Sequence, residues 1–312
     1  MRVFLAGATG AIGRQLLPLL VQAGHEVTAM TRSPTRAGWI SSEHAQAVVC
    51  DIFDRERLRQ ALMEARPEVL IHQLTSIPKR IHPRRVVEEL AATNRLRTEG
   101  TLVLMEAARA IKVRRVIAQS VSFFYNPNGG SAASESEGLF RLIPGASELV
   151  DTIHVHEHAV LGSPRIEGVV LRYGSFYGPG TSFAGDGSFA NDVRWRRVPI
   201  VGEGKGRFSF IHVRDAAAVT AMFVGAGEPG IYNVVDNDPA AVADWLPYYA
   251  GLLTAKRPFR VPELMGRMRA GAYGAYMMTG QRGASNQKIK DAVGWKPAYA
   301  SWREGFRAEL CG

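Results

Sequence analysis

The first residues of this chain constrain its fold more than any other segment. Residues 2–6 (RVFLA) are mostly apolar, the run GATGAIG fills positions 7–13, and residues 15–23 carry apolar side chains at helical spacing. A strand that enters a helix through such a loop presents free helix N–H groups to a phosphate. The pattern predicts a nucleotide loop, with a glycine-rich turn without a ligand as the alternative. The expected contacts are Gly7, Thr9, Gly10, Ala11, Ile12 and Gly13.

The same alternation of strand and helix continues along the first half of the chain. Short apolar runs, each bounded by turn residues, occur at 26–31, 47–50, 69–73, 115–118 and 168–171, and helical patterns at 55–65, 86–110 and 153–161. Runs of this kind are typical of buried parallel strands joined by crossover helices. The expected fold class is α/β, a doubly wound parallel Rossmann sheet.

The pattern changes after about residue 173, where glycine and proline become dense. Two later strands are expected at 208–213 and 230–235, and residues 239–312 look mainly helical. We therefore expect a nucleotide-binding Rossmann domain at 1–175, with 208–235 returning to it. Residues 176–207 and 236–312 would form a smaller, mainly helical substrate lobe at the carboxyl edge of the sheet. Segment 126–148, rich in Gly, Ser and Glu, is a candidate mobile flap.

Composition excludes several classes of function. The formal charge is +9, but the basic residues are scattered and form no nucleic-acid-binding motif, so we expect no nucleic-acid partner. No run approaches the roughly 18 apolar residues of a membrane span, and the N-terminus has no signal-peptide pattern, which predicts a cytoplasmic protein without a membrane partner. Cys50 and Cys311 are too few for a disulfide framework. Oligomeric state is left open.

The end of the second strand indicates which nucleotide binds. An NAD site usually has a carboxylate there for the ribose 2′-hydroxyl. Here the sequence reads TRSPTR at 31–36. Arg32 and Arg36 can donate to a 2′-phosphate, and Ser33 can add a hydrogen bond. We predict NADP(H), against the alternative of two solvated arginines.

With these residues in view, the chain resembles the extended, epimerase/dehydratase-like branch of the short-chain dehydrogenase/reductase superfamily over nearly its whole length. The resemblance rests on the run at 7–13, CDI at 50–52, HQLT at 72–75, Arg172 with YGPG at 177–180, HVRD at 212–215 and GWKP at 294–297. It implies that Asp51 and Ile52 hold the adenine and that Leu74 and Thr75 line the path to the nicotinamide. Ser120 and Tyr173 complete the expected cofactor site.

The departures from this family concern its catalysts, a Ser or Thr after the fifth strand and a Tyr-x-x-x-Lys on the next helix. Alignment on Tyr125 and Glu157 puts Val121, Leu149 and Ile153 at these positions. In the family the lysine lowers the pKa of the tyrosine, which then exchanges a proton with the substrate oxygen. Without the pair, hydride transfer from a nicotinamide remains feasible, but the proton needs another source. The sequence resembles atypical members of the superfamily that reduce polyketide ketones in antibiotic assembly, angucyclinone-type ketoreductases among them.

Several side chains are candidates for the missing roles. Ser120 and Ser122 stand at the carboxyl end of the fifth strand and are the candidate catalytic hydroxyls, although capping the strand end is as good an explanation. Tyr125 and Tyr177 are expected to contact substrate, since an ordinary phenol is a poor acid. His154 is a candidate proton donor or substrate contact. A metal site built from His154, His156 and His158 is not expected, because only the first and last share a helix face.

Three functions remain open at this stage. The first is an NADPH-dependent ketoreductase acting on a bulky, polycyclic secondary metabolite. The second is a nucleotide-sugar-type epimerase or dehydratase, which Leu149 disfavours because that chemistry uses the tyrosine as base. The third is a non-catalytic NADP-sensing protein.

Overall fold

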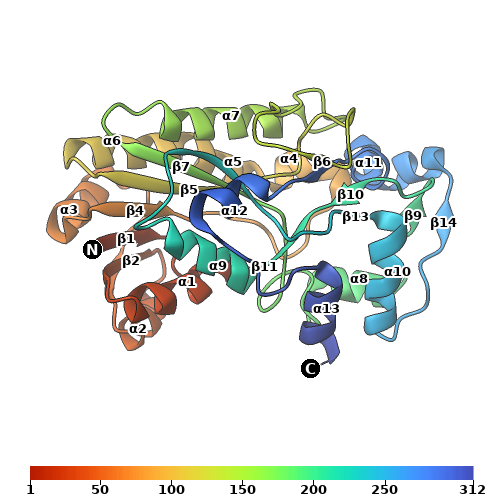
Figure 1. Ribbon diagram of the computed structural model, residues 1–312, viewed down its shortest axis with the longest axis horizontal. Helices are drawn as coiled ribbons and strands as arrows, with labels where there is room; N and C mark the ends of the chain where they lie inside the picture. Colours follow the sequence, from red (N-terminus) through yellow and green to blue (C-terminus); the bar gives the residue numbers. More distant parts are fainter. Residues whose placement is uncertain (312) are drawn as a thin grey trace.

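The computed structural model describes residues 1–311 and is built around one seven-stranded sheet (Figure 1). The strand order is β12-β7-β5-β4-β1-β2-β3, and every neighbouring pair is parallel. The bounds are β1 Arg2–Ala6, β2 Glu26–Thr31, β3 Gln46–Val49, β4 Val69–His72, β5 Arg115–Val121, β7 Glu167–Tyr173 and β12 Gly230–Val234. The order reverses at β1, so the ends of β1 and β4 flank the crevice where doubly wound folds bind ligands.

Helices cover both faces of this sheet (Figure 1). One face packs on α1 (Ala11–Gln22), α2 (Pro34–Ser42), α9 (Val213–Met222) and α12 (Gln287–Val293) through a single apolar cluster. The other face packs on α3 (Arg55–Ala65), α6 (Thr101–Ala110) and the C-terminal end of α7 (Ser147–Leu161). The predicted doubly wound α/β sheet is confirmed.

Two elements that the sequence predicted as continuous are divided in the structure. The expected helix 86–110 is divided into α4 (Val86–Glu89), α5 (Ala91–Arg95), the π-helical turn η2 (Leu96–Gly100) and α6. The expected strand 208–213 is also divided: β10 (Arg207–Phe208) pairs with β13 (Ala240–Ala241), and β11 (Phe210–His212) pairs with β8 (Ser175–Tyr177). Neither piece joins the large sheet. After β7, the next strand of the chain that belongs to the large sheet is β12.

The C-terminal part builds a second lobe beyond the carboxyl edge of the sheet (Figure 1). Its helices are α8 (Ser188–Arg194), α10 (Val242–Leu252), α11 (Glu263–Thr279) and α13 (Trp302–Cys311), with short strands β9 (Ile200–Val201) and β14 (Arg260–Val261). Aromatic side chains, including Phe210, Trp245, Tyr249 and Phe306, form its core. None of the helices within residues 1–311 combines the length and apolarity needed to cross a membrane.

Segment 126–148 is held in place by several contacts. Its short strand β6 (Ala132–Ala133) pairs with β15 (Gly283–Ala284). Arg282 donates to the carbonyls of Asn126, Asn128, Gly130 and Ala132 and forms an ion pair with Glu137.

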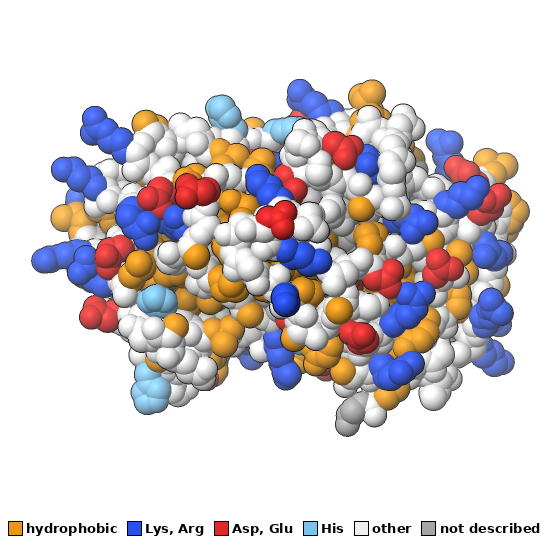
Figure 2. Space-filling view, in the orientation of Figure 1, with side chains coloured by type: hydrophobic (Ala, Val, Ile, Leu, Met, Phe, Trp, Pro, Cys, Tyr) orange, Lys and Arg blue, Asp and Glu red, His pale blue; other side chains and the backbone are white. Residues whose placement is uncertain are grey.

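On the molecular face in Figure 2, basic side chains are scattered among acidic and apolar ones, as the sequence suggested.

Candidate active site

The loop after β1 owes its shape to two glycines. Gly7 has φ +100°, and a Cβ there would lie 2.6 Å from the carbonyl oxygen of Gln73. A Cβ at Gly13 would lie 2.3 Å from the carbonyl oxygen of Gly7, so any larger residue would push α1 off the loop. Gly10 is different: a Cβ there would meet nothing closer than the Gly7 oxygen at 3.5 Å. Its outer side therefore faces open space, where a phosphate can approach.

The first turn of α1 leaves its N–H groups available. Gly10 is the N-cap residue and supplies no side-chain acceptor, and there is no acidic residue in the first turn. These donors and the positive end of the helix dipole suit an anion. Thr9 and Ala11 border the loop, whereas the Ile12 side chain is buried in the core beneath it. The loop therefore fits a dinucleotide pyrophosphate.

The adenosine end presents two exposed arginines. Ser33 is the N-cap of α2, and its backbone N–H donates to the Thr31 hydroxyl (3.1 Å). Arg36 reaches back to the Thr9 hydroxyl (3.4 Å), which places its guanidinium beside the phosphate loop. Within residues 1–311, neither Arg32 nor Arg36 forms an ion pair with a carboxylate. Both charges are thus free for an anionic ligand.

Asp51, Ile52, Leu74 and Thr75 lie along the same crevice, after β3 and β4. The Asp51 carboxylate is exposed and accepts from the backbone N–H of Phe53 (2.9 Å), whereas Ile52 is buried. The backbone N–H of Leu74 donates to His72 (3.3 Å), which fixes the turn after β4, and Thr75 is exposed. The predicted contacts of adenine and nicotinamide ribose are therefore spread along one edge of the sheet.

A buried hydrogen-bond chain joins the sheet to α6 and α7 behind this edge. His72 bonds the Thr101 hydroxyl (3.1 Å), which bonds His156 (2.7 Å), and His156 bonds the backbone oxygen of Gln119 (2.8 Å). Burial lowers the pKa of both histidines, that of His156 to about 4. Both are therefore neutral near pH 7. Both ring nitrogens of His156 form hydrogen bonds within the protein, one with Thr101 and one with the backbone of Gln119.

The Ser120 hydroxyl belongs to a second buried network. It donates to Glu157 (2.7 Å), whose carboxylate also accepts two hydrogen bonds from Arg172 (2.8 and 2.6 Å). Arg172 donates to the phenol of Tyr125 (3.0 Å), and this phenol donates to Asn233 (2.7 Å). Burial raises the pKa of Tyr125. Ser120 and Tyr125 therefore lie together, but their hydroxyls serve a structural ion pair.

The structure directs the other predicted hydroxyls away from the crevice. Ser122 donates to the backbone oxygen of Tyr173 (3.2 Å), which is the strand-end role considered above. The phenol of Tyr173 points into the core, where it bonds Gln73 (2.9 Å) and Thr220 (2.7 Å). Tyr177 lies in a different cluster of side chains: it is fully buried in the C-terminal lobe against α13. Its hydroxyl oxygen has no polar partner among residues 1–311.

The three positions of the missing catalysts lie together in one apolar cluster. Leu149 and Ile153 are buried, and Val121 packs against the same group, which also includes Phe124 and Tyr276. His154 projects from another side of α7, and its Nε2 atom is buried without a partner among the described residues. No group of three potential metal ligands occurs within residues 1–311.

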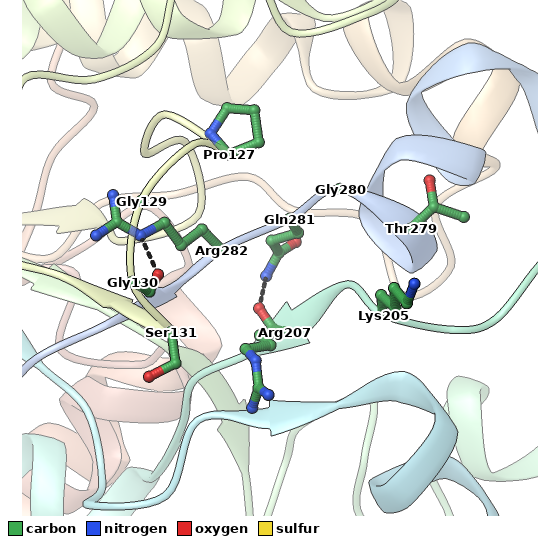
Figure 3. A pocket seen from close by; sticks show the side chains of 10 residues that line it. All are labelled: Pro127, Gly129, Gly130, Ser131, Lys205, Arg207, Thr279, Gly280, Gln281 and Arg282. Carbon is green, nitrogen blue, oxygen red and sulfur yellow. Dashed lines mark hydrogen bonds between the residues drawn. The ribbon is translucent and has the colours of Figure 1, made fainter.

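A separate cleft of about 470 Å³ lies where the 127–131 loop meets the end of α11 (Figure 3). Its three cations are already engaged: Arg282 holds the loop, Arg207 donates to the backbone oxygen of Pro239 (3.2 Å), and Lys205 pairs with Glu203. Gln281 donates to the backbone of Arg207 (3.2 Å). The cleft is a structural junction between segment 126–148 and the second lobe.

Comparisons with known proteins agree with this geometry. The sequence profile of the NAD dependent epimerase/dehydratase family matches residues 3–234. The chain is 40% identical to a 3-diazoavenalumate denitrifying reductase of Streptomyces sp, over 99% of this chain and all of the relative. It is 30% identical over 117 residues to a 4-hydroxy-2-methyl-3-oxo-4-farnesyl-3,4-dihydroquinoline-1-oxide ketoreductase of Stigmatella aurantiaca, covering 38% of this chain and 32% of that one.

The fold matches solved structures at lower identity. The UDP-glucose 4-epimerase of Thermus thermophilus, solved with NAD, superposes with a TM-score of 0.76 at 21% identity, covering all of this chain and 98% of that one. The sheet, the phosphate loop and the crevice together define an NAD(P)-dependent oxidoreductase of the extended short-chain type. The chain belongs to the NAD dependent epimerase/dehydratase family, as the sequence motifs indicated.

Proposed function

We propose that this chain is an NADPH-dependent reductase that removes the diazo group of an aromatic secondary metabolite as dinitrogen. The observation that carries the proposal is the 40% identity, over the full length, to a denitrifying reductase of a diazo compound. The geometry supports it, because apolar side chains fill the positions where this family keeps its proton-transfer residues.

The chemistry explains why such a site needs no general acid. Reduction of a ketone forms an alkoxide and consumes a proton: ketone + NADPH + H⁺ gives alcohol + NADP⁺. The diazo group of the aromatic substrate is written here as the aryl diazonium ArN₂⁺. Its reduction consumes no proton: ArN₂⁺ + NADPH gives ArH + N₂ + NADP⁺. The two electrons of the hydride replace the C–N bond by a C–H bond, and dinitrogen leaves. A site with Leu149 and Ile153 at the positions of the family's tyrosine and lysine is therefore sufficient for the second reaction.

The residues of the chain would bind the reactants and exclude water from them. Bound NADPH would supply the hydride. Residues 7–13 would hold its pyrophosphate, and Arg32 and Arg36 its 2′-phosphate, each as a charge-assisted contact. The wall formed by Leu149 and Ile153 would exclude water, which otherwise converts an aryl diazonium to a phenol.

The direct test mixes purified protein, NADPH and 3-diazoavenalumate and measures NADPH oxidation together with gas release. We expect one dinitrogen for each NADPH oxidised, and slower turnover with NADH. NADPH binding without oxidation of any substrate would instead support the NADP-sensing protein. A protein without the phosphate-loop function, Gly10→Val, is the negative control.

Ketone reduction on a bulky polycyclic metabolite is the second candidate, favoured by the partial match to a quinoline ketoreductase. Its proton would come from the substrate, for example from a phenol beside the ketone. Methylation of that phenol should then leave binding intact and slow reduction. Oxidation of NADPH by polycyclic ketones, with none by the diazo compound, would select this candidate.

Replacement of the four polar candidates tests the absence of a general acid. Ser120→Ala, Ser122→Ala, Tyr125→Phe and His154→Ala should each keep denitrification within about tenfold of wild type, the effect of one hydrogen bond. A positioned general acid contributes about 10²–10⁴-fold. A variant that binds NADPH but loses turnover by that factor would identify the acid and contradict the acid-free reaction.

A further inference from the structure

Arg97 is a buried cation that the proposed chemistry does not use. It lies in η2, is only 5% exposed, and its Nε atom has no hydrogen-bond partner among the described residues. Within residues 1–311 no carboxylate oxygen lies within ion-pair distance of its guanidinium. A buried charge without a partner is costly, so proteins keep one mainly where a ligand completes it.

The surroundings of Arg97 do not neutralise its charge. The nearby carboxylate, that of Glu157, already accepts two hydrogen bonds from Arg172 and one from Ser120. The nearby imidazoles of His72 and His156 are neutral because burial lowers their pKa values. The region therefore keeps one positive charge in excess.

Arg97 also lies at the border of the substrate lobe. Helix α7, which carries Leu149 and Ile153, packs against η2. On the lobe side the neighbour is Tyr273, from the part of α11 that follows the break at Gly271. Arg97 thus stands where the wall of the proposed reaction site meets the lobe expected to bind substrate.

We propose that Arg97 binds a carboxylate of the substrate. A guanidinium presents paired N–H donors that match a carboxylate, and the low dielectric around it strengthens the bond. The inference rests on the proposed function, because it names the group by which a diazo-substituted carboxylate is held. The name of the 40% identical relative's substrate, 3-diazoavenalumate, is that of a carboxylate.

Binding measurements test this inference separately from turnover. Titration calorimetry would use avenalumate, the carboxylate without its diazo group, and its methyl ester, each with NADP⁺ present. We expect avenalumate to bind wild type about ten- to hundredfold more tightly than the ester, the usual range for one charge-assisted hydrogen bond. Arg97→Met should lose this difference, and Arg97→Lys should keep part of it. Equal affinity of acid and ester for wild type, or no binding of either, would overturn the proposal.

The control variant is Arg95→Met, two residues away on the same helical segment. Arg95 is exposed and pairs with Glu99 (2.9 Å), so its loss should not change avenalumate affinity. NADPH affinity should stay within about twofold of wild type in all three variants, because none of these side chains is assigned to the cofactor. A large loss of NADPH affinity in Arg97→Met would assign Arg97 to the cofactor instead and overturn the proposal.

Thermal unfolding separates a binding role from a structural one. If Arg97 serves a ligand, the ligand-free Arg97→Met protein should melt at or above the wild-type temperature, because the substitution removes an unpaired buried charge. A lower melting temperature, or failure of this variant to fold, would make Arg97 a structural residue and overturn the proposal. Arg97-dependent binding of avenalumate without reduction of its diazo derivative would leave the inference intact and refute the proposed function.

Discussion

The substitution Glu157→Gln tests the buried ion pair that joins α7 to the sheet. The side chains of Glu157 and Arg172 are 5% and 4% exposed, and their closest N–O distance is 2.6 Å. Glutamine has nearly the same shape, but it removes the negative charge and turns an amide NH₂ group toward other donors. The charge of Arg172 would then remain buried without a counter-ion.

The size of the effect follows from this loss. Removal of one partner of a buried pair costs about 3–5 kcal/mol. With an unfolding entropy of about 2.1 cal/mol/K per residue, a chain of this length should lose about 5–8 °C in melting temperature. Circular dichroism melts of wild type and variant at pH 7 measure the difference.

The exposed pair Arg95–Glu99 supplies the matched control. These side chains are 57% and 61% exposed, so Glu99→Gln should cost at most about 1 kcal/mol, or less than about 2 °C. If Glu157→Gln also melts within about 2 °C of wild type, the buried network does not stabilise the fold as argued.

Three further outcomes are expected. Arg32→Ala should weaken NADPH binding about ten- to hundredfold and leave NADH binding nearly unchanged, since one charge-assisted contact to the 2′-phosphate is lost; equal weakening of both would refute the NADPH preference. Gly10→Val should abolish binding of either nucleotide in a folded protein, because the side chain fills the phosphate approach; retained binding by fluorescence titration would refute the loop assignment. His156 should contribute about 3 kcal/mol to the fall in wild-type stability as pH drops from about 6.5 to 4, because the unfolded chain protonates this histidine there and the folded chain does not. Urea unfolding should show a smaller fall for His156→Gln, and an identical fall would contradict this.

The large sheet was predictable because each strand is a short apolar run that repeats one local signal. The expected strands 2–6 and 26–31 are β1 and β2 themselves, and the others differ by a few residues. The strand expected at 208–213 failed because the same apolar residues serve two small sheets, and the sequence does not show which strand pairs with which. Helix 86–110 was read with one continuous period, and the π-helical turn at 96–100 interrupts that period. Its only glycine, Gly100, stands at the last position of the turn and so does not show where the turn begins.

The polar residues of the site were harder to assign from sequence. Glu157 and Arg172 were noticed only as family features, since nothing local shows that a helix residue and a strand residue form an ion pair. Arg97 was missed, although a signal existed. It precedes Thr101 by four residues and Leu104 by seven, so it shares the buried face of that helix. A charged residue on an apolar helical stripe is the pattern that would have found it.

The proposed function would explain both the loss of the tyrosine–lysine pair, because the reaction needs no proton, and the unpaired cation at Arg97, because the substrate would carry a carboxylate. Arg97 would bind the carboxylate of a diazo-substituted substrate. Leu149 and Ile153 would exclude water, which would otherwise attack its diazo group. Restoring the pair should therefore bring no gain. Ile153 is fully buried, so Leu149→Tyr with Ile153→Lys would place a second unpaired cation in the apolar cluster and lower the melting temperature. At a temperature where both proteins are folded, the double variant should reduce 3-diazoavenalumate no faster than wild type. A gain in kcat of about tenfold would show that proton supply limits the wild-type enzyme, and the argument from the missing catalysts would fail.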